Sequence, residues 1–295
     1  MIKKILLFIL AIFLVAVIRF TYPLVYQVFI DSDNVPASTT VKVMAHRGAS
    51  GYAPENTLAS FQKALELHVD IIEFDVHLTK DNQLIIIHDS ELSRTTNMKG
   101  AVHDYTLAEL RQADAGCWFG PEFSKEKLPT LGEVLALING QTYCIIELKW
   151  DHDEGYYTGL SALTAKEIEK VNGYDWCTVQ SFESRYLDEL HVINPNIKLV
   201  KAMIGAWPSP IFGFYYDIGF HWGKYRVPEY LWAINVYYKT ITTTQVNTWH
   251  QNGARVWTYT INDPDQMRQQ INIGVDGVLT NYPNKLAAII GRPEK

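Results

Sequence analysis

The chain has 295 residues and a formal net charge of −6, so nothing in its charge indicates a nucleic-acid partner. Hydrophobic residues make up 47% and charged residues 20%, which is the composition of a globular protein. This length is sufficient for one large α/β barrel.

The first predicted element is an apolar segment at residues 1–30. Two lysines precede the apolar run Ile5–Ile18, and the sequence stays mostly apolar to Ile30. We expect an uncleaved, single-pass membrane anchor whose lysines are cytoplasmic and whose following body is extracytoplasmic. The run is shorter than the ~20 residues of a spanning helix, so the anchor has to extend beyond it. Two alternatives stay open: a cleaved signal peptide that leaves a secreted protein, and a helix buried in the body. Residues 31–40 form a linker.

Residues 41–295 alternate short apolar runs with amphipathic helical patterns, which predicts a (β/α)8 TIM barrel. Eight strands are expected, at residues 41–46, 70–78, 142–148, 177–182, 197–204, 233–238, 255–261 and 276–280.

One segment, "FDVHLTKDNQLIIIHD", does not alternate with a helix. Its two apolar runs are joined by only a few polar residues, which predicts an antiparallel hairpin. If Thr79 pairs with Leu84, Asp75 lies opposite His88, about 5 Å away. Residues from about 80 to 128 then form an insertion after the second strand.

Three cysteines cannot all pair, so a disulfide framework is not expected. Cys144 and Cys177 lie on predicted strands and are expected to face the helices as core thiols. Cys117 lies in a loop and receives no role.

Acidic side chains gather at the carboxyl ends of the predicted strands, where barrel enzymes place their chemistry. Glu73 and Asp75 are two residues apart on one strand and so share a face, and Glu147 joins them from the neighbouring strand. Oxygen-only ligands of this kind are typical of Mg²⁺ or Ca²⁺. The alternative is an acidic barrel layer that Lys149 and Arg47 neutralise.

Two histidines, His46 and His88, end apolar strands beside these acids, which favours a general acid and base pair. Arg47 offers two parallel donors to a phosphate, and Gly48 allows close approach of backbone. Lys149 adds a second cation. The pattern indicates a phosphodiester site.

The sequence resembles the glycerophosphodiester phosphodiesterase family. The resemblance rests on an ordered set of segments that covers nearly all of residues 43–290: "AHRGASGYAPENTLASF", "IEFDVHLTKDNQLIIIHD", "LSRTTNMKG", "WFGPEF", "LPTLGEVL", "IIELK", "VQSF", "WTYTIND" and "GVDGVLTNYP". It implies a phosphodiesterase barrel with an insertion after the second strand. It also implies His46 and His88 as acid and base, the three carboxylates as metal ligands, and Arg47 and Lys149 as phosphate-binding residues.

In the mechanism that the resemblance implies, the glycerol hydroxyl of the substrate attacks phosphorus while one histidine removes its proton. The other histidine protonates the leaving alcohol, and water then opens the cyclic phosphate. Two positions, Ser93 and Asn281, depart from the aspartate that the family often has there. Neither is an expected ligand, so we expect these departures to affect substrate detail rather than activity.

An aromatic stretch, residues 205–225, follows the fifth predicted strand and includes Trp207 and Phe212. It is either a self-packed cap or an apolar wall for an acyl chain or a bilayer interface. Trp257 and Tyr259, on the seventh predicted strand, are either substrate contacts or barrel core. The wall interpretation makes lysophospholipids plausible substrates, cut on the head-group side as by a lysophospholipase D. A non-catalytic barrel that binds phospholipid head groups is a further alternative.

Overall fold

The computed structural model describes residues 41–150, 155–207 and 213–292. The predicted anchor at 1–30, the linker and Phe212 lie outside the described residues. Residues 38–295 form one compact unit. Across the described ranges, every helix is too short or too polar to cross a bilayer. The membrane anchor therefore stays a prediction.

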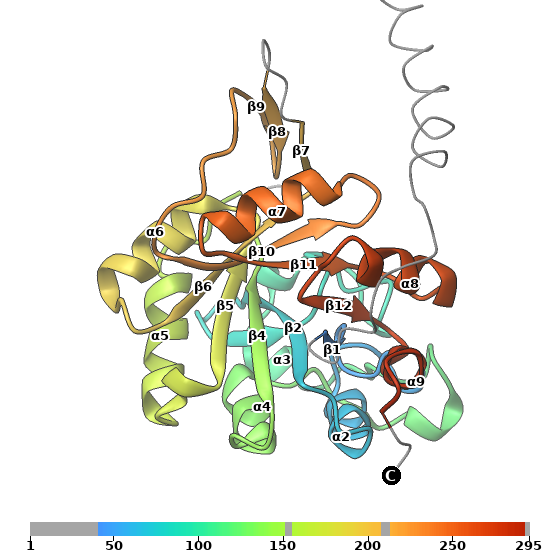
Figure 1. Cartoon of the computed structure of the whole chain (residues 1–295). Helices are drawn as coiled ribbons and strands as arrows, with labels where there is room; N and C mark the ends of the chain where they lie inside the picture. Colours follow the sequence, from blue (N-terminus) through green and yellow to red (C-terminus); the bar gives the residue numbers. More distant parts are fainter. Residues whose placement is uncertain (1–40, 151–154, 208–212, 293–295) are drawn as a thin grey trace, which may run out of the picture. The chain divides into compact units, whose positions relative to one another are not determined.

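Eight parallel strands, all within the described residues, form a closed barrel at the centre of this unit (Figure 1). Neighbours pair in the order β1-β12-β11-β10-β6-β5-β4-β2, and pairing of β1 with β2 closes the ring. All eight predicted strands are confirmed: β1 (Lys42–Ala45), β2 (Ile71–Leu78), β4 (Tyr143–Leu148), β5 (Cys177–Ser181), β6 (Lys198–Met203), β10 (Leu231–Tyr237), β11 (Arg255–Tyr259) and β12 (Gly277–Thr280).

Helices follow the strands and cover the outside of the barrel (Figure 1). The helices α2, α4 and α7 begin after a threonine whose hydroxyl accepts a backbone N–H three residues further on, which satisfies a donor that the helix itself leaves unpaired. The outer helices are α2 (Leu58–Glu66), α4 (Leu131–Ile138), α5 (Leu160–Lys170), α6 (Ser184–Ile193), α7 (Thr243–Gln251), α8 (Pro264–Asn272) and α9 (Pro283–Ile289), with the short η3 (Gly173–Asp175) before β5.

The strand β3 (Leu84–Ile86) pairs antiparallel with β2, as the sequence predicts, but in a different register. The N–H of Thr79 donates to the carbonyl of Gln83 at 3.0 Å, so the loop has three residues. Asp75 then lies opposite Ile87, whose N–H donates to the Asp75 carbonyl at 3.1 Å. The predicted pairing of Asp75 with His88 is therefore wrong by one residue, because the turn is one residue longer than assumed.

After β3 the chain leaves the barrel and returns at α4. This insertion includes η1 (Val102–Asp104), α3 (Leu107–Leu110) and η2 (Pro121–Phe123). It has a small core of its own, which buries Ile85, Ile87, Leu92, Val102, Leu110, Ala113, Ala115 and Leu128. This separate core lets the insertion hold its own shape beside the barrel.

A second small sheet follows β6. It is antiparallel and contains β7 (Gly205–Trp207), β8 (Phe214–Tyr216) and β9 (Phe220–Trp222). The sequence predicts an aromatic loop here, and the structure shows that part of it is ordered strand. Because β6 ends at the carboxyl end of the barrel, this sheet stands at the end where barrel active sites lie (Figure 1).

The barrel interior has an apolar layer below a polar one. The apolar layer buries Met44, Ile71, Ile145, Val200, Ala233, Trp257 and Leu279. Trp257 is 1% exposed, so the structure favours the barrel-core alternative for this residue. Closer to the carboxyl ends, buried Glu73, Glu147 and Gln180 replace the apolar side chains. Glu73, Glu147 and Gln180 thus lie toward the end of the barrel at which the carboxyl ends of the strands meet.

Cys144 and Cys177 are core thiols, as expected. They lie opposite each other on β4 and β5, fully buried, with their sulfur atoms 3.6 Å apart. Both are free cysteines, and Cys117 is free and exposed.

Candidate active site

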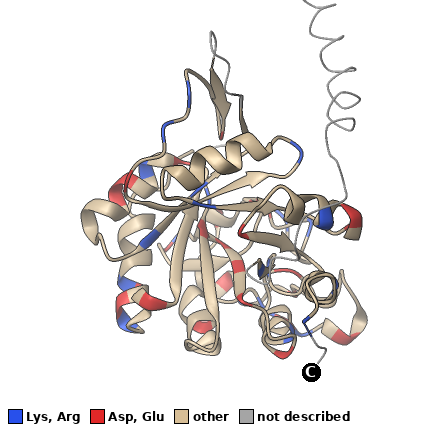
Figure 2. Cartoon of the chain, viewed as in Figure 1, with Lys and Arg blue, Asp and Glu red and all other residues tan. Residues whose placement is uncertain are grey.

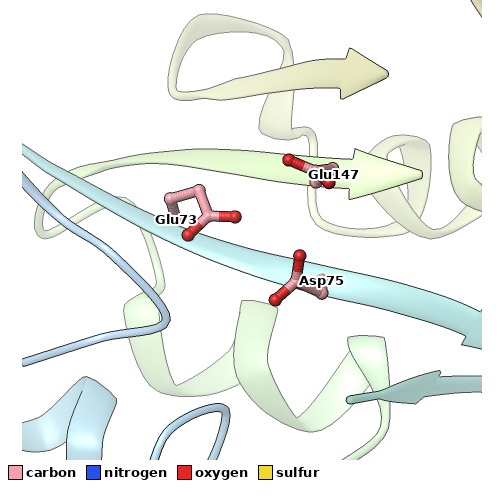
Figure 3. Close-up of side chains that lie close together, drawn as sticks. All are labelled: Glu73, Asp75 and Glu147. Atoms are coloured by element: carbon pink, nitrogen blue, oxygen red, sulfur yellow. The ribbon is translucent and has the colours of Figure 1, made fainter. Parts of the chain in front are cut away.

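Three carboxylates meet inside the mouth of the barrel (Figure 3). Glu73 and Asp75 come from β2, and Glu147 comes from β4, where it lies directly opposite Asp75. One oxygen from each lies within 4.8 Å of the others, and all three side chains are buried. Carboxylates this close repel one another unless cations lie between them.

Two basic side chains compensate part of this charge. Lys149, just after β4, places Nζ 2.6 Å from Glu147 and 3.1 Å from Asp75. Arg47 places Nε 3.4 Å from Asp75. Burial alone disfavours the anion of Asp75, but Lys149, His88 and Arg47 hold its pKa well below the usual range. Three acids against two bases leave an excess of one negative charge.

Glu73 carries this imbalance. Burial, with Asp75 and Glu147 beside it, raises the pKa of Glu73 well above the usual value of 4.5. Its partner among the described residues is the Arg47 N–H, which donates to Oε2 at 2.9 Å. The cluster is therefore strained in its fully ionised form, and a further cation would relieve it.

The loop after β1 presents its backbone to this cluster. Arg47 has a left-handed backbone (φ 55°), and Gly48 follows with φ 77°. A Cβ on Gly48 would lie 2.5 Å from the hydroxyl of Ser60, so only glycine fits beside α2. The sharp turn aims the Arg47 N–H at Glu73 and leaves His46 and the guanidinium at the mouth.

Asn56, just before α2, supports the same cluster. It is also left-handed (φ 58°), and its Nδ2 donates to Asp75 at 2.8 Å. Its neighbour Glu55 accepts from Arg47 at 2.7 Å. The "PEN" segment thus holds one carboxylate of the cluster and one arginine in place.

His46 is oriented from the far end of the chain. Its Nδ1 lies 2.7 Å from Oδ1 of Asn281, so Nδ1 carries the proton and Nε2 is left as an acceptor. Asn281 is itself held by Asn262, whose Oδ1 accepts its backbone N–H at 2.9 Å. Burial and the nearby Arg47 lower the pKa of His46 to about 3, so the imidazole is neutral. A neutral, oriented imidazole is suited to act as a base.

His88 is held differently. Its Nδ1 lies 2.6 Å from Asp89, a charged partner where His46 has a neutral one. Arg94 donates to both Asp89 and Glu55 at 2.5–2.9 Å and so joins the insertion to the first loop. The Asp89 carboxylate accepts from Nδ1 and so fixes the orientation of the His88 ring.

A cavity of about 480 Å³ opens beside these groups. Its lining contains His77, His88, Asp89, Ser90, Glu91, Glu147, Leu148, Lys149, Trp150 and Phe182. This volume is in the range of small-molecule sites. The structure therefore brings together His88, Glu147 and Lys149 at the wall of a cavity. Glu73 and Asp75 lie behind them in the carboxylate cluster, and Arg47 contacts Asp75.

Residues 46–285 match the profile of the glycerophosphoryl diester phosphodiesterase family. The chain belongs to this family. It is accordingly an enzyme of the phosphoric diester hydrolase class.

Individual relatives agree with this membership. The chain is similar to a glycerophosphodiester phosphodiesterase from Caldanaerobacter subterraneus, at 34% identity over 84% of this chain and 97% of the relative. Among solved structures, it is similar to an Oleispira antarctica phosphodiesterase in complex with the product sn-glycerol-3-phosphate, with 30% identity and a TM-score of 0.70 over 86% of this chain and 98% of the other. It is also similar to the Agrobacterium tumefaciens glycerophosphodiester phosphodiesterase, with 26% identity and a TM-score of 0.67 over 84% of this chain and 99% of the other. The match covers nearly the whole of both solved chains, so each of those chains consists of the barrel unit alone.

The phosphodiesterase site has supports that the sequence analysis missed. Asp89 and Glu55 lie inside the quoted motifs "IIIHD" and "PENT", but their partners were not predicted. Asn281 is expected above to affect only substrate detail, whereas it contacts His46 directly. His77 is a further addition, because its buried ring lies 3.0 Å from the His88 carbonyl and 3.1 Å from the Tyr157 hydroxyl. Among these supports, only Asp89 could be predicted from a local sequence signal, because it directly follows His88.

Glu147 is positioned by a chain of amides across the barrel. Gln180 on β5 donates to Glu147 at 2.6 Å, and Asn235 on β10 donates to Gln180 at 2.9 Å. These neutral groups fix the carboxylate without neutralising it.

The candidate wall residues separate into different environments. Tyr259 is half-buried, and its hydroxyl donates to the Met203 carbonyl at 3.0 Å. Its ring contacts Phe182, which lines the cavity. Trp207 ends β7. A substrate contact by Tyr259 or Trp207 stays a prediction.

Proposed function

We propose that this phosphodiesterase hydrolyses glycerophosphodiesters to a glycerol phosphate and an alcohol. The observation that carries the proposal is the placement of two oppositely supported histidines beside a buried, partly compensated carboxylate cluster. Arg47 adds a second argument, because its buried Nε makes no hydrogen bond within the described residues although it lies near Asp75. A phosphate oxygen would supply that partner.

Each residue has a definite task in this reaction. The neutral Nε2 of His46 takes the proton from the attacking glycerol hydroxyl, and His88, supported by Asp89, gives a proton to the leaving alcohol. Arg47 and Lys149 hold the charged phosphoryl oxygens. Water then opens the cyclic phosphate with the histidines in reversed roles. The assignment of base and acid follows from the neutral partner of one imidazole and the anionic partner of the other.

We also propose that Glu73, Asp75 and Glu147 hold one divalent cation, Mg²⁺ or Ca²⁺. The donor set fits, because it is made only of oxygens and has an excess of negative charge. When bound, such a cation supplies charge stabilisation to a phosphoryl oxygen. The three carboxylates bring that charge to the wall of the cavity while staying buried themselves.

The test offers glycerophosphocholine to the barrel, residues 38–295, with Mg²⁺, Ca²⁺ or EDTA, and measures choline release. We expect cation-dependent release, lost by at least about a hundredfold in His46→Ala. His68→Asn is the matched control, because His68 is an exposed histidine away from the mouth with a left-handed backbone that asparagine tolerates. Release that is unchanged by His46→Ala would contradict the mechanism.

A lysophospholipid is the second candidate substrate. The exposed aromatic side chains of the small sheet beside the mouth favour it, since they offer apolar surface near the cavity. Lysophosphatidylcholine, offered at equal concentration, distinguishes the two by its ratio of kcat/KM to that of glycerophosphocholine. A non-catalytic role predicts retained ligand binding with no release from either compound.

The proposed location is a membrane, through the N-terminal apolar run, with the barrel on the extracytoplasmic side; secretion after cleavage is the alternative. Both rest on the sequence alone. Fractionation of cells that express the full chain, followed by protease protection, separates them.

A further inference from the structure

The small sheet has two chemically different faces. Residues opposite each other in an antiparallel pair share a face, and here Phe214 lies opposite Trp222 and Tyr216 opposite Phe220. One face of β8 and β9 is therefore entirely aromatic. The other face carries Tyr215.

The aromatic face is open to solvent. Trp222 is 75% exposed, Phe220 51% and Tyr216 39%. Phe220 stacks on Phe214 and meets Trp222 edge to face, so the rings form one continuous patch. Single exposed apolar residues are ordinary, but a contiguous exposed patch marks an interaction site.

The opposite face is tied to the barrel. Tyr215 stacks on His221 at 4.4 Å and packs against Tyr225. His221 in turn contacts Asp217 at 2.8 Å, in the turn between β8 and β9. The sheet therefore has one anchored side and one side on which Tyr216, Phe220 and Trp222 are exposed.

A buried ion pair fixes the sheet beside the catalytic cavity. Lys201, on β6 and only 1% exposed, lies 2.8 Å from Asp217 and also donates to the Phe182 carbonyl. Phe182 lines the cavity. One ammonium group thus joins the base of the aromatic sheet to the rim of the active site.

Most of the exposed charge beside the patch is positive, with Glu229 as an exposed acid on the same connection. Lys224 and Arg226 are exposed on the connection that follows β9, where Figure 2 shows separate blue segments, and Lys239 is exposed after β10. From Gly213 to Val227, the described chain has Asp217 as its one acid, and that acid is paired. Exposed aromatic rings flanked by cations fit an interface with anionic head groups.

We propose that the aromatic face of the β8–β9 hairpin docks on the surface of an anionic lipid bilayer, so that the catalytic mouth meets the membrane. The docking goes beyond the proposed hydrolysis and does not depend on it. The rings enter the head-group region, and Lys224 and Arg226 contact lipid phosphates.

The length of chain that precedes β1 is compatible with a membrane as the partner of the aromatic face. The apolar run Ile5–Ile18 is separated from β1 by residues 19–41, whose contour length is at most about 80 Å. The longest barrel strand, β2, has eight residues and spans about 26 Å. An anchor at that run is therefore compatible with a mouth that faces the same membrane.

The test measures co-sedimentation of the barrel, residues 38–295, with vesicles of phosphatidylcholine alone or mixed equally with phosphatidylglycerol. The barrel is used because its solved relatives fold at the same extent and because the apolar run would bind vesicles by itself. We expect binding to the mixed vesicles that weakens in high salt.

Two variants separate the contributions. Phe220→Ala/Trp222→Ala should weaken binding to mixed vesicles at least about tenfold, because the rings supply the buried apolar area. Lys224→Gln/Arg226→Gln should weaken binding to mixed vesicles roughly tenfold and leave neutral vesicles unaffected.

The matched control removes two exposed aromatic side chains elsewhere, Trp118→Ala/Tyr143→Ala, and should bind as the wild type does. Circular dichroism checks that each variant folds. The proposal is overturned if the wild-type barrel does not bind mixed vesicles, or if the aromatic double variant binds as well as the control.

Two other results would also overturn the proposal, because each assigns the aromatic face to a different occupant. A dimer that the aromatic double variant dissociates in sedimentation equilibrium would assign the face to a second copy. Binding of monomeric lysophosphatidylcholine without vesicle binding would assign it to a single acyl chain. Hydrolysis of soluble glycerophosphocholine, measured on the same samples, reports separately on the proposed function and should be equal in all of them.

Discussion

Glu73→Gln gives a direct test of the carboxylate cluster, because it removes one of three acids and leaves Lys149 and Arg47 in place. In the metal-free wild type, the pKa of Glu73 is raised above 4.5. The folded protein then keeps a proton that the unfolded chain has already released. The contribution of Glu73 to the free energy of unfolding should therefore fall as the pH rises between these two pKa values, by up to about 1.4 kcal/mol per pH unit, against the opposite slope that the lowered pKa of His46 contributes below pH 6.5. Glutamine has no such proton, so this slope should vanish in the variant.

A bound cation should stabilise the wild type more than it stabilises Glu73→Gln. At a hundred times its dissociation constant, Mg²⁺ or Ca²⁺ should stabilise the wild type by about 2.7 kcal/mol. For a domain of this size, that raises the melting temperature by roughly 5–10 °C. Glu73→Gln should lose most of this gain, whereas Glu66→Gln, a change at an exposed glutamate on α2, should keep it.

The assay is urea unfolding at pH 5, 6, 7 and 8, in EDTA or in excess cation. Equal stabilisation of wild type and Glu73→Gln by the cation would show that Glu73 is not a ligand. A metal-free wild type with no pH slope relative to the variant would show that Lys149 and Arg47 neutralise the cluster fully. That outcome would restore the alternative of a structural acidic layer.

Three further changes test the supports of the site. Asn281→Asp places an anion beside His46 and should raise the pKa of His46 from about 3 by one to three units. Because the base must be neutral, the variant should need a higher pH for activity. Titration of the ring by NMR measures the pKa, and an unchanged value would refute the reasoning. Asp89→Asn should lower kcat about 10- to 100-fold with little change in KM, because His88 loses its anionic partner. Steady-state kinetics at saturating cation measure both parameters. A fall in kcat accompanied by an equal rise in KM would mean that the role of Asp89 is only structural. Lys201→Met leaves a buried aspartate without its cation and should cost about 3–5 kcal/mol of stability in urea unfolding, and a loss below about 1 kcal/mol would mean that the pair is not buried in solution.

Much of the fold was predictable because the barrel repeats a simple pattern. Each strand is a short apolar run flanked by turn residues, and its helix has a 3.6-residue period, so all eight strands were found. The faces of Glu73 and Asp75 follow from the two-residue period of a strand. The register of the β2–β3 hairpin did not follow, since it depends on whether the turn has two or three residues and several polar residues fit either.

The supports of the two histidines were harder to predict. Asn281 meets His46 across 235 positions of sequence, and no local pattern encodes a hydrogen bond of that span. Asp89 is adjacent to His88, but an adjacent acid is equally common on an exposed turn. The shared aromatic face of β8 and β9 could not be predicted, because only the pairing shows which rings lie on one face.

The bridge formed by Glu55 has a consequence for how this enzyme can change over evolutionary time. One carboxylate holds Arg47 of the first loop and Arg94 of the insertion, and Arg94 holds the partner of His88. The insertion is therefore not an exchangeable module, because a graft from another protein would have to bring equivalents of Arg94 and Asp89 or lose the support of His88. Variation in this lineage should accordingly concentrate in the outer part of the insertion, while the residues that meet Glu55 change only together.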